Sequence, residues 1–190
     1  MTTPQMEDIG VVWRGVAVPF GEGARVREPS GEIVEEYFDE LSIAISGRPR
    51  GIPLLLGHDH RAAPAGTVDT SEIVPGVGLV AEGRLVGAPA EIEGWRARWQ
   101  ADLMTRLSIG FSHRGRQEWR RPRRPGDPPR VIRRGVSVAE VSLVTWPAYR
   151  SARVESLRQR TARSEKSQAF MEEAAAECAA VDARLAARRK

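Results

Sequence analysis

A serine, a histidine and a glutamate in this sequence could form a nucleophilic triad. Ser108 lies between apolar neighbours in LMTRLSIGF, His58 follows the apolar run LLLG, and Glu140 lies within AEVSLVTWPAY. A serine hydroxyl becomes a good nucleophile when a base takes its proton, and histidine titrates near neutral pH. A carboxylate can orient the imidazole and stabilise its charged form. We therefore predict that Ser108 is the nucleophile, His58 its base and Glu140 the residue that orients that base.

Each of these residues also has an ordinary structural explanation. Ser108 alternates with apolar residues as a solvent-facing strand residue would, and the G-x-S-x-G nucleophile elbow is missing from the sequence. His58 and His60 both suit a polar loop, and His60 is an alternative base. Glu140 suits the open face of a sheet, and His113 is a rival third member. The residues alone leave these alternatives open.

Length and composition fit one globular domain with a tail. The chain has 190 residues, of which 41% are hydrophobic and 28% charged, enough for a core. Its single cysteine excludes an intrachain disulfide and indicates a reducing compartment, and three histidines with one cysteine do not favour a zinc site. The N-terminus resembles no signal peptide, and no apolar run approaches the roughly 20 residues of a membrane span. We expect a protein that is neither secreted nor bound to a membrane.

Short apolar runs separated by glycine and proline predict a mainly β fold, as a sheet or barrel. Residues 21–31 are predicted to be a loop or irregular hairpin, and residues 38–46 a short helix or an apolar edge. In residues 107–113 the apolar side chains take one face and Ser108 the other. The predicted strands are 9–20, 32–38, 52–56, 64–70, 76–86, 107–113 and 136–146.

One segment, residues 89–106, has the period of a helix. Ile92, Trp95, Trp99 and Leu103 recur at spacings of three and four residues and form one apolar stripe. Pro89 suits the first helical turn. The pattern predicts an amphipathic helix that ends just before Ser108.

Basic residues are concentrated in one segment and in the C-terminal part. The net charge is only +4, yet nine arginines and four prolines lie between Arg114 and Arg134. This density predicts an exposed, extended loop or a long hairpin arm. Its function has two interpretations: a surface that binds nucleic acid or an acidic partner, or a solvated insertion. Residues 1–8 are predicted to be flexible, and residues 159–190, rich in Ala, Arg and Glu, to be a helical or disordered tail.

Four motifs, in order, resemble the prohead proteases of tailed phages, which are related in fold to the herpesvirus assemblins. They are the opening GVAVPFGE, the histidine motif LLLGHDHRAAPAGTV, the serine motif LMTRLSIGFSHR of the form S-x-G-F, and the closing element AEVSLVTWPAYRSARV. The resemblance runs from about Val12 to Val154 and implies a protease domain over residues 9–158. The implied fold is mainly β with flanking helices, a herpesvirus-protease-like β-barrel.

The resemblance also implies roles for the candidate residues. Ser108 would be the nucleophile and His58 the base. Glu140 stands where the family keeps an acidic residue, whereas assemblins use a second histidine as the third member. The family often has an asparagine before the motif histidine, where this chain has Gly57.

The implied activity is that of a serine endopeptidase in prohead maturation. It would cleave the scaffold segment of the major capsid protein, and also itself, inside the assembling procapsid in the host cytoplasm. Acyl transfer to water needs no cofactor. By analogy with assemblins we expect a homodimer, and a weak DNA contact through Arg114–Arg134 is a further expectation. The alternatives are an inactive protease-fold scaffold or capsid-binding assembly protein, and a basic nucleic-acid-binding domain.

Overall fold

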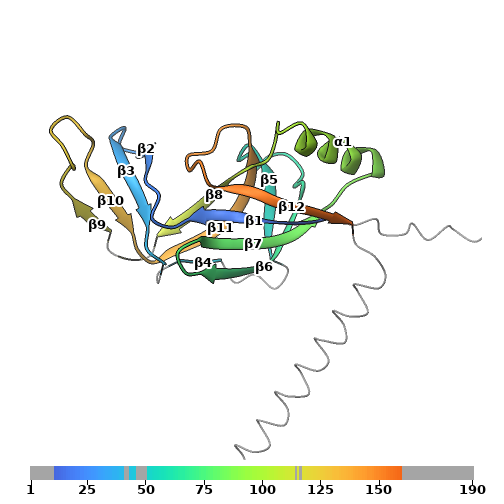
Figure 1. Cartoon of the computed structure of the whole chain (residues 1–190), viewed down its shortest axis with the longest axis horizontal. Coiled ribbons are helices and arrows are strands. Elements are labelled where there is room, and N and C mark those ends of the chain that lie inside the picture. Colours follow the sequence, from blue (N-terminus) through green and yellow to red (C-terminus); the bar gives the residue numbers. More distant parts are fainter. Residues whose placement is uncertain (1–10, 41–42, 46–50, 114, 116, 160–190) are drawn as a thin grey trace, which may run out of the picture. The chain divides into compact units, whose positions relative to one another are not determined.

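The computed structural model describes residues 11–40, 43–45, 51–113, 115 and 117–159 (Figure 1). These residues form twelve strands and one helix. The predicted flexible N-terminus and all but the first residue of the predicted tail lie outside the described residues. Within the described part, no helix is long and apolar enough to cross a membrane.

Seven strands close into a barrel, which confirms the predicted mainly β fold, and one helix is found among the described residues where flanking helices were predicted. Their order is β11-β5-β6-β7-β1-β12-β8, and β8 pairs again with β11. The short β4 (Ile43–Ile45) adds to the edge of β11, so this described part of residues 38–46 takes the predicted edge form and not the helix. The barrel strands are β1 (Val11–Pro19), β5 (Ile52–Leu56), β6 (Gly66–Val74), β7 (Gly78–Leu85), β8 (Arg106–His113), β11 (Val136–Val144) and β12 (Arg153–Gln159).

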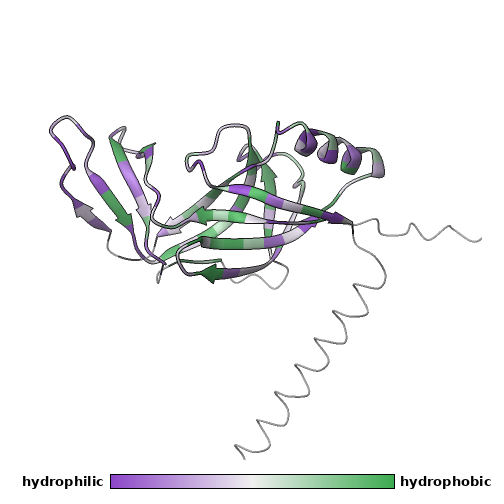
Figure 2. Cartoon of the chain, in the orientation of Figure 1, coloured by the Kyte–Doolittle hydropathy of each residue, from purple (hydrophilic) through white to green (hydrophobic). Residues whose placement is uncertain are grey.

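Apolar side chains from these strands form the core, because alternate residues of a strand point to the same face. Figure 2 shows hydrophobic residues along β5 and β11. Leu54 on β5, Leu107 on β8 and Val141 on β11 are completely buried. Burial of each such side chain contributes about 2 kcal/mol to the free energy of unfolding. The core therefore fixes the register of β8 against β11.

A second, four-stranded sheet has the order β2-β3-β10-β9. It consists of β2 (Ala24–Arg27), β3 (Ile33–Phe38), β9 (Glu118–Arg120) and β10 (Arg130–Arg133). Of the two forms predicted for residues 21–31, a loop or an irregular hairpin, the hairpin is found: β2 pairs antiparallel with β3, the next strand.

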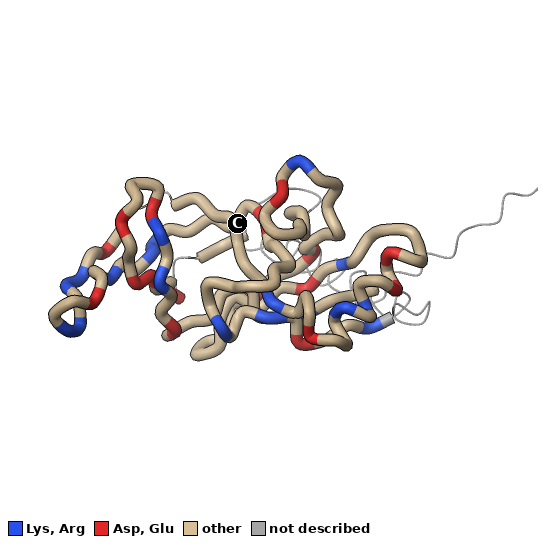
Figure 3. The backbone as a smooth tube through the Cα atoms, turned by 90° about the horizontal axis from the view of Figure 1, so that it is seen from above, with Lys and Arg blue, Asp and Glu red and all other residues tan. Residues whose placement is uncertain are grey.

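The arginine-rich segment forms the β9–β10 hairpin of this second sheet. Of the two predicted forms, the hairpin arm is the one found, but it is not exposed throughout. Arg133 is buried and pairs with Glu28 and Glu36, while Arg134 pairs with Glu118. Figure 3 shows basic and acidic residues interspersed on this sheet. These two arginines of the segment are thus paired with acidic residues of the same chain.

The helix α1 (Pro89–Gln100) is shorter than predicted. Ile92 is buried, as expected for the apolar stripe, but Leu103 lies beyond the helix and is 61% exposed. The helix ends because Asp102 adopts a left-handed φ of 54° and the N–H of Leu103 donates to the carbonyl of Arg98. These are the features of a Schellman C-cap. The earlier end leaves residues 106–113 free to form β8.

Candidate active site

Three neighbouring elements carry Ser108, His58 and Glu140. Ser108 lies on β8 directly opposite Ser142 of β11, and Glu140 of β11 lies opposite Gly110. His58 follows β5, which pairs with the other edge of β11. Because β11 lies between β5 and β8, the ring of His58 lies next to two residues that are distant in the sequence. Ser108 is 50 positions and Glu140 is 82 positions from His58.

The imidazole of His58 contacts both of the other residues. Its Nδ1 lies 2.6 Å from Oε1 of Glu140, and its Nε2 lies 2.9 Å from Oγ of Ser108. Because a carboxylate accepts hydrogen bonds, Nδ1–H donates to Glu140, and Nε2 is left to accept the hydroxyl proton of Ser108. This is the arrangement of a nucleophile, a base and an orienting acid.

Glu140 is not on an open face of the sheet, so that interpretation is wrong. The residue is only 1% exposed, because the turn after β5 brings His58 over this face of β11. A buried carboxylate is stable only when it accepts hydrogen bonds. Here one oxygen accepts from His58 and the other accepts from Ser142 at 2.7 Å.

Ser142 connects the backbone of His58 to the carboxylate of Glu140, and sequence reasoning gave it no role. Its side chain is completely buried, its hydroxyl donates to Glu140 Oε2, and its Oγ accepts from the backbone N–H of His58 at 3.2 Å. The contacts form a closed ring through Ser142, Glu140 and His58. The signal was present in the sequence, since Ser142 is two residues from Glu140 and shares its face of the strand.

Replacing Ser142 with alanine should lower kcat about tenfold while the protein stays folded. The variant loses one hydrogen bond to a carboxylate, which contributes roughly 1.5–3 kcal/mol, and one tie to the backbone of His58. Steady-state kinetics with a peptide substrate measures the effect. Ser112→Ala, on the exposed part of β8, is the matched control. Equal activity of Ser142→Ala and Ser112→Ala would show that Ser142 positions nothing.

Two successive left-handed residues turn the chain at the histidine. Gly57 has φ 57° and His58 has φ 61°. Glycine adopts this conformation readily and asparagine more easily than other residues. Gly57 therefore fits the position where the resembled family often has asparagine. The N–H of Asp59 donates to the carbonyl of Leu56 at 3.0 Å, which closes the turn.

Gly110 lies beneath the carboxylate of Glu140. A Cβ at this position would overlap Oε1 of Glu140 and lie 2.9 Å from its Cγ. The carboxylate has no easy way to move, because His58 and Ser142 hold both of its oxygens. Position 110, two residues after Ser108, therefore requires glycine, because the side chain of Glu140 occupies the space that a Cβ would need.

We expect Gly110→Ala to lower kcat about a hundredfold, the effect of a displacement of roughly 1 Å in a catalytic group. Kinetics and thermal unfolding should be measured together. Gly94→Ala, in the interior of α1, is the control, since its Cβ meets only the flexible end of Arg98. The control should keep full activity. Full activity in Gly110→Ala would mean that Glu140 does not need its observed position.

The two other histidines occupy different places. His60 is exposed in the turn after β5, and His113 is exposed at the far end of β8. His113 is five residues from Ser108, about 16 Å along the strand. The residue that contacts Nδ1 of His58 is Glu140, and the residue that contacts Nε2 is Ser108.

The hydrogen bond that Nδ1–H donates to Glu140 raises the pKa of His58 above its ordinary value of 6.5, while partial burial of the ring acts in the opposite direction. A raised pKa makes the imidazole a stronger base and stabilises its protonated form. These are the properties that a general base for Ser108 needs.

Comparison with known proteins gives the family. A family model described as the caudovirus prohead serine protease matches residues 4–167. Searches of curated proteins and of solved structures gave no match. The matched range contains the whole barrel and the serine, histidine and glutamate described above. The chain belongs to the caudovirus prohead serine proteases, hydrolases that cleave peptide bonds in phage capsid maturation.

Proposed function

We propose that Ser108 is the nucleophile of this protease, His58 its general base and Glu140 the residue that orients the base. The observation that supports this assignment is the pair of hydrogen bonds from the His58 ring, one to Ser108 and one to Glu140. The neighbouring alternatives, His60 and His113, have no comparable support.

The proposed mechanism is acyl transfer in two steps. The Oγ of Ser108 attacks the peptide carbonyl carbon while Nε2 of His58 takes the hydroxyl proton. Glu140 stabilises the imidazolium, which then gives its proton to the leaving amine, and the C–N bond breaks. In the second step a water molecule attacks the acyl carbon while Nε2 of His58 takes its proton. The ester bond to Oγ then breaks, His58 gives the proton back to Oγ of Ser108, and the carboxylic acid product leaves.

The proposed substrate is the scaffold segment of the major capsid protein, cut inside the assembling procapsid in the host cell. This rests on the family, whose description places the protease in the prohead. We also propose that the protease cuts itself, which would release residues 159–190 as a scaffold-like or targeting segment. Homodimerisation and a weak DNA contact remain predictions. The ion pairs of Arg133 and Arg134 reduce the charge that is free for DNA.

Co-expression with the capsid protein tests this function. Wild type and Ser108→Ala should be compared by intact mass of both proteins. Wild type is expected to shorten the capsid protein, and Ser108→Ala is not. If neither cuts and the protein still associates with shells, it is an assembly factor without protease activity. If both cut equally, Ser108 is not the nucleophile.

A further inference from the structure

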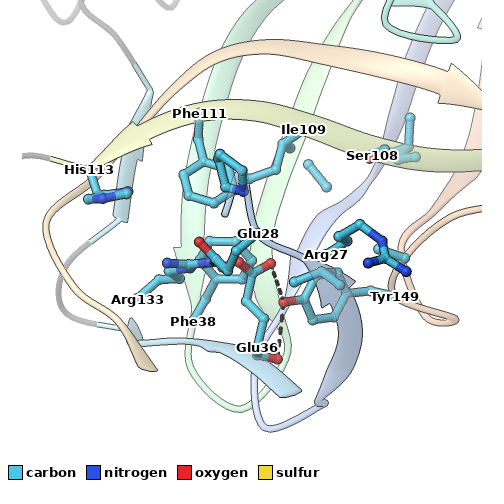
Figure 4. Close-up of a pocket in the computed structure, with 15 residues that line it drawn as sticks. Arg27, Glu28, Glu36, Phe38, Ser108, Ile109, Phe111, His113, Arg133 and Tyr149 are labelled. Atoms are coloured by element: carbon cyan, nitrogen blue, oxygen red, sulfur yellow. Dashed lines mark hydrogen bonds and ion pairs between the residues drawn. The ribbon is translucent and has the colours of Figure 1, made fainter. Parts of the chain in front are cut away.

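A cavity of about 340 Å³ lies beside Ser108, between β8 and the second sheet (Figure 4). Its apolar lining includes Ile109 and Phe111 of β8 and Phe38 of β3. The Phe38 and Phe111 rings meet edge to face with centroids 5.2 Å apart. A single aromatic ring already fits a cavity of roughly 150 Å³. The space is ample for a large apolar side chain next to the proposed nucleophile.

Three of the four charged groups in this cavity, Arg133, Glu28 and Glu36, pair with one another. Arg133 Nε donates to Glu36 at 2.6 Å, another nitrogen of Arg133 donates to Glu28, and the Tyr149 hydroxyl donates to Glu36 at 2.9 Å. At the exposed rim, Arg27 donates to the carbonyl of Gly31.

The lining thus holds two carboxylates and two guanidinium groups, whose formal charges cancel. A basic substrate side chain would lose its hydration here to reach carboxylates that Arg133 already occupies, and an acidic one would meet Arg27 only at the exposed rim. An apolar side chain would instead gain contact with the aromatic walls. The cavity therefore favours an apolar, uncharged occupant.

The edge of β8 beside the cavity is open to a further strand. Among the described residues, β8 has a strand partner on this second edge only at Arg106, opposite Arg153 of β12. The N–H of Leu107 points to the same edge and donates to Ala152. Because backbone groups of a strand alternate in direction, those of Ile109 and Phe111 point there too. An extended peptide can pair with them.

We propose that the substrate lies extended along this edge of β8 and places an apolar side chain in the cavity, which acts as a specificity subsite. The inference rests on the proposed function for its substrate, a capsid peptide. Phe111, Phe38 and Ile109 would then be specificity-determining residues. Pairing along β8 places the peptide backbone beside Ser108. The cavity then determines which substrate side chain binds next to Ser108.

Peptide binding to Ser108→Ala tests the subsite without cleavage. The peptides span the capsid cleavage region and carry Leu, Ala, Lys or Asp at each position in turn. Fluorescence anisotropy gives the Kd of each peptide for Ser108→Ala. One position should prefer Leu over Lys and Asp by at least about 30-fold in Kd. Equal binding of all four residues at every position, or a preference for a charged one, would overturn the proposal.

A second variant shows whether that preference comes from the cavity. Ala148 lines the cavity and is exposed, so Ala148→Phe should fill the space without disturbing the core. Added to Ser108→Ala, it should reduce the Leu preference at that position at least tenfold. Thr145→Phe, on the same loop but outside the cavity lining, should retain it. An unchanged preference with Ala148→Phe would place the subsite elsewhere.

N-methylation of the peptide tests the pairing with β8. Methyl groups on alternate backbone nitrogens should weaken binding more than tenfold in one register and little in the other. Equal effects in both registers would exclude pairing along β8. Selective binding without cleavage by the wild type would overturn the proposed protease function alone. Cleavage without selectivity would overturn the subsite alone.

Discussion

Replacing His58 with alanine should lower kcat by about 10⁶-fold, the loss seen when the base of a serine protease triad is removed. Without the imidazole, the proton of the Ser108 hydroxyl has no acceptor at 2.9 Å. KM should change little, because His58 is proposed to act on the reacting groups and not on substrate binding. Cleavage of a capsid-derived peptide, followed by mass spectrometry over long incubations, measures the residual rate.

His60→Ala is the control for this prediction. It changes the same residue type two positions away, at an exposed position of the same turn, and should keep wild-type kinetics. The opposite result, an inactive His60→Ala with an active His58→Ala, would make His60 the base. Loss of activity in both variants, with intact folding, would indicate that the turn itself is required.

Glu140→Gln should lower kcat by about 10⁴-fold, the effect of an amide in place of the triad acid. The amide is nearly the same size as the carboxylate, so folding should be retained. It can no longer stabilise the imidazolium, and its NH₂ can favour the wrong tautomer of His58. Kinetics at saturating peptide, with circular dichroism to establish folding, measures the loss. A reduction of less than tenfold would show that Glu140 only fills space.

The pH dependence gives a second result for the same variant. His58 must be neutral to act as base, and its pKa is raised above 6.5 by Glu140. The acid limb of kcat/KM in the wild type should therefore lie above pH 6.5, and Glu140→Gln should move it to lower pH. If the acid limb of kcat/KM lies at the same pH in Glu140→Gln as in the wild type, a group other than His58 controls that limb.

The same shift links the His58–Glu140 pair to stability. Because the pKa of His58 is higher in the folded state than the ordinary 6.5, the stabilisation is fully present below that value. It is lost as the pH rises through the folded pKa. Urea unfolding of wild type and His58→Ala across this pH range should show that the difference between their free energies of unfolding becomes smaller as the pH rises.

The sequence was sufficient to predict the strands that carry the site. The alternation of residues 107–113 correctly separated Ser108 and Gly110 from Leu107, Ile109 and Phe111, because a strand has a period of two. It was not sufficient for α1, whose end depends on one left-handed residue, Asp102. For residues 21–31 it left a loop and an irregular hairpin open, because the four-residue β2 is defined only by its pairing with the next strand, β3.

Burial at the site was the other feature that the sequence did not reveal. Alternation put Glu140 and Ser142 on one face of β11 and suggested that this face was open. Both are buried because His58 comes from another strand across a turn of two left-handed residues. Such a contact depends on strand order in the barrel, which periodicity within one segment does not encode. The motif resemblance carried that information instead.

Reaction of the full-length protein with a fluorophosphonate probe tests the central claim most directly. Such probes phosphonylate an activated serine, and peptide mass mapping identifies the modified residue. We predict a single adduct on Ser108, formed at least a hundredfold more slowly in His58→Ala and Glu140→Gln, and no adduct in Ser108→Ala. An adduct on another serine, or an unchanged rate at Ser108 without His58, would contradict the proposed triad.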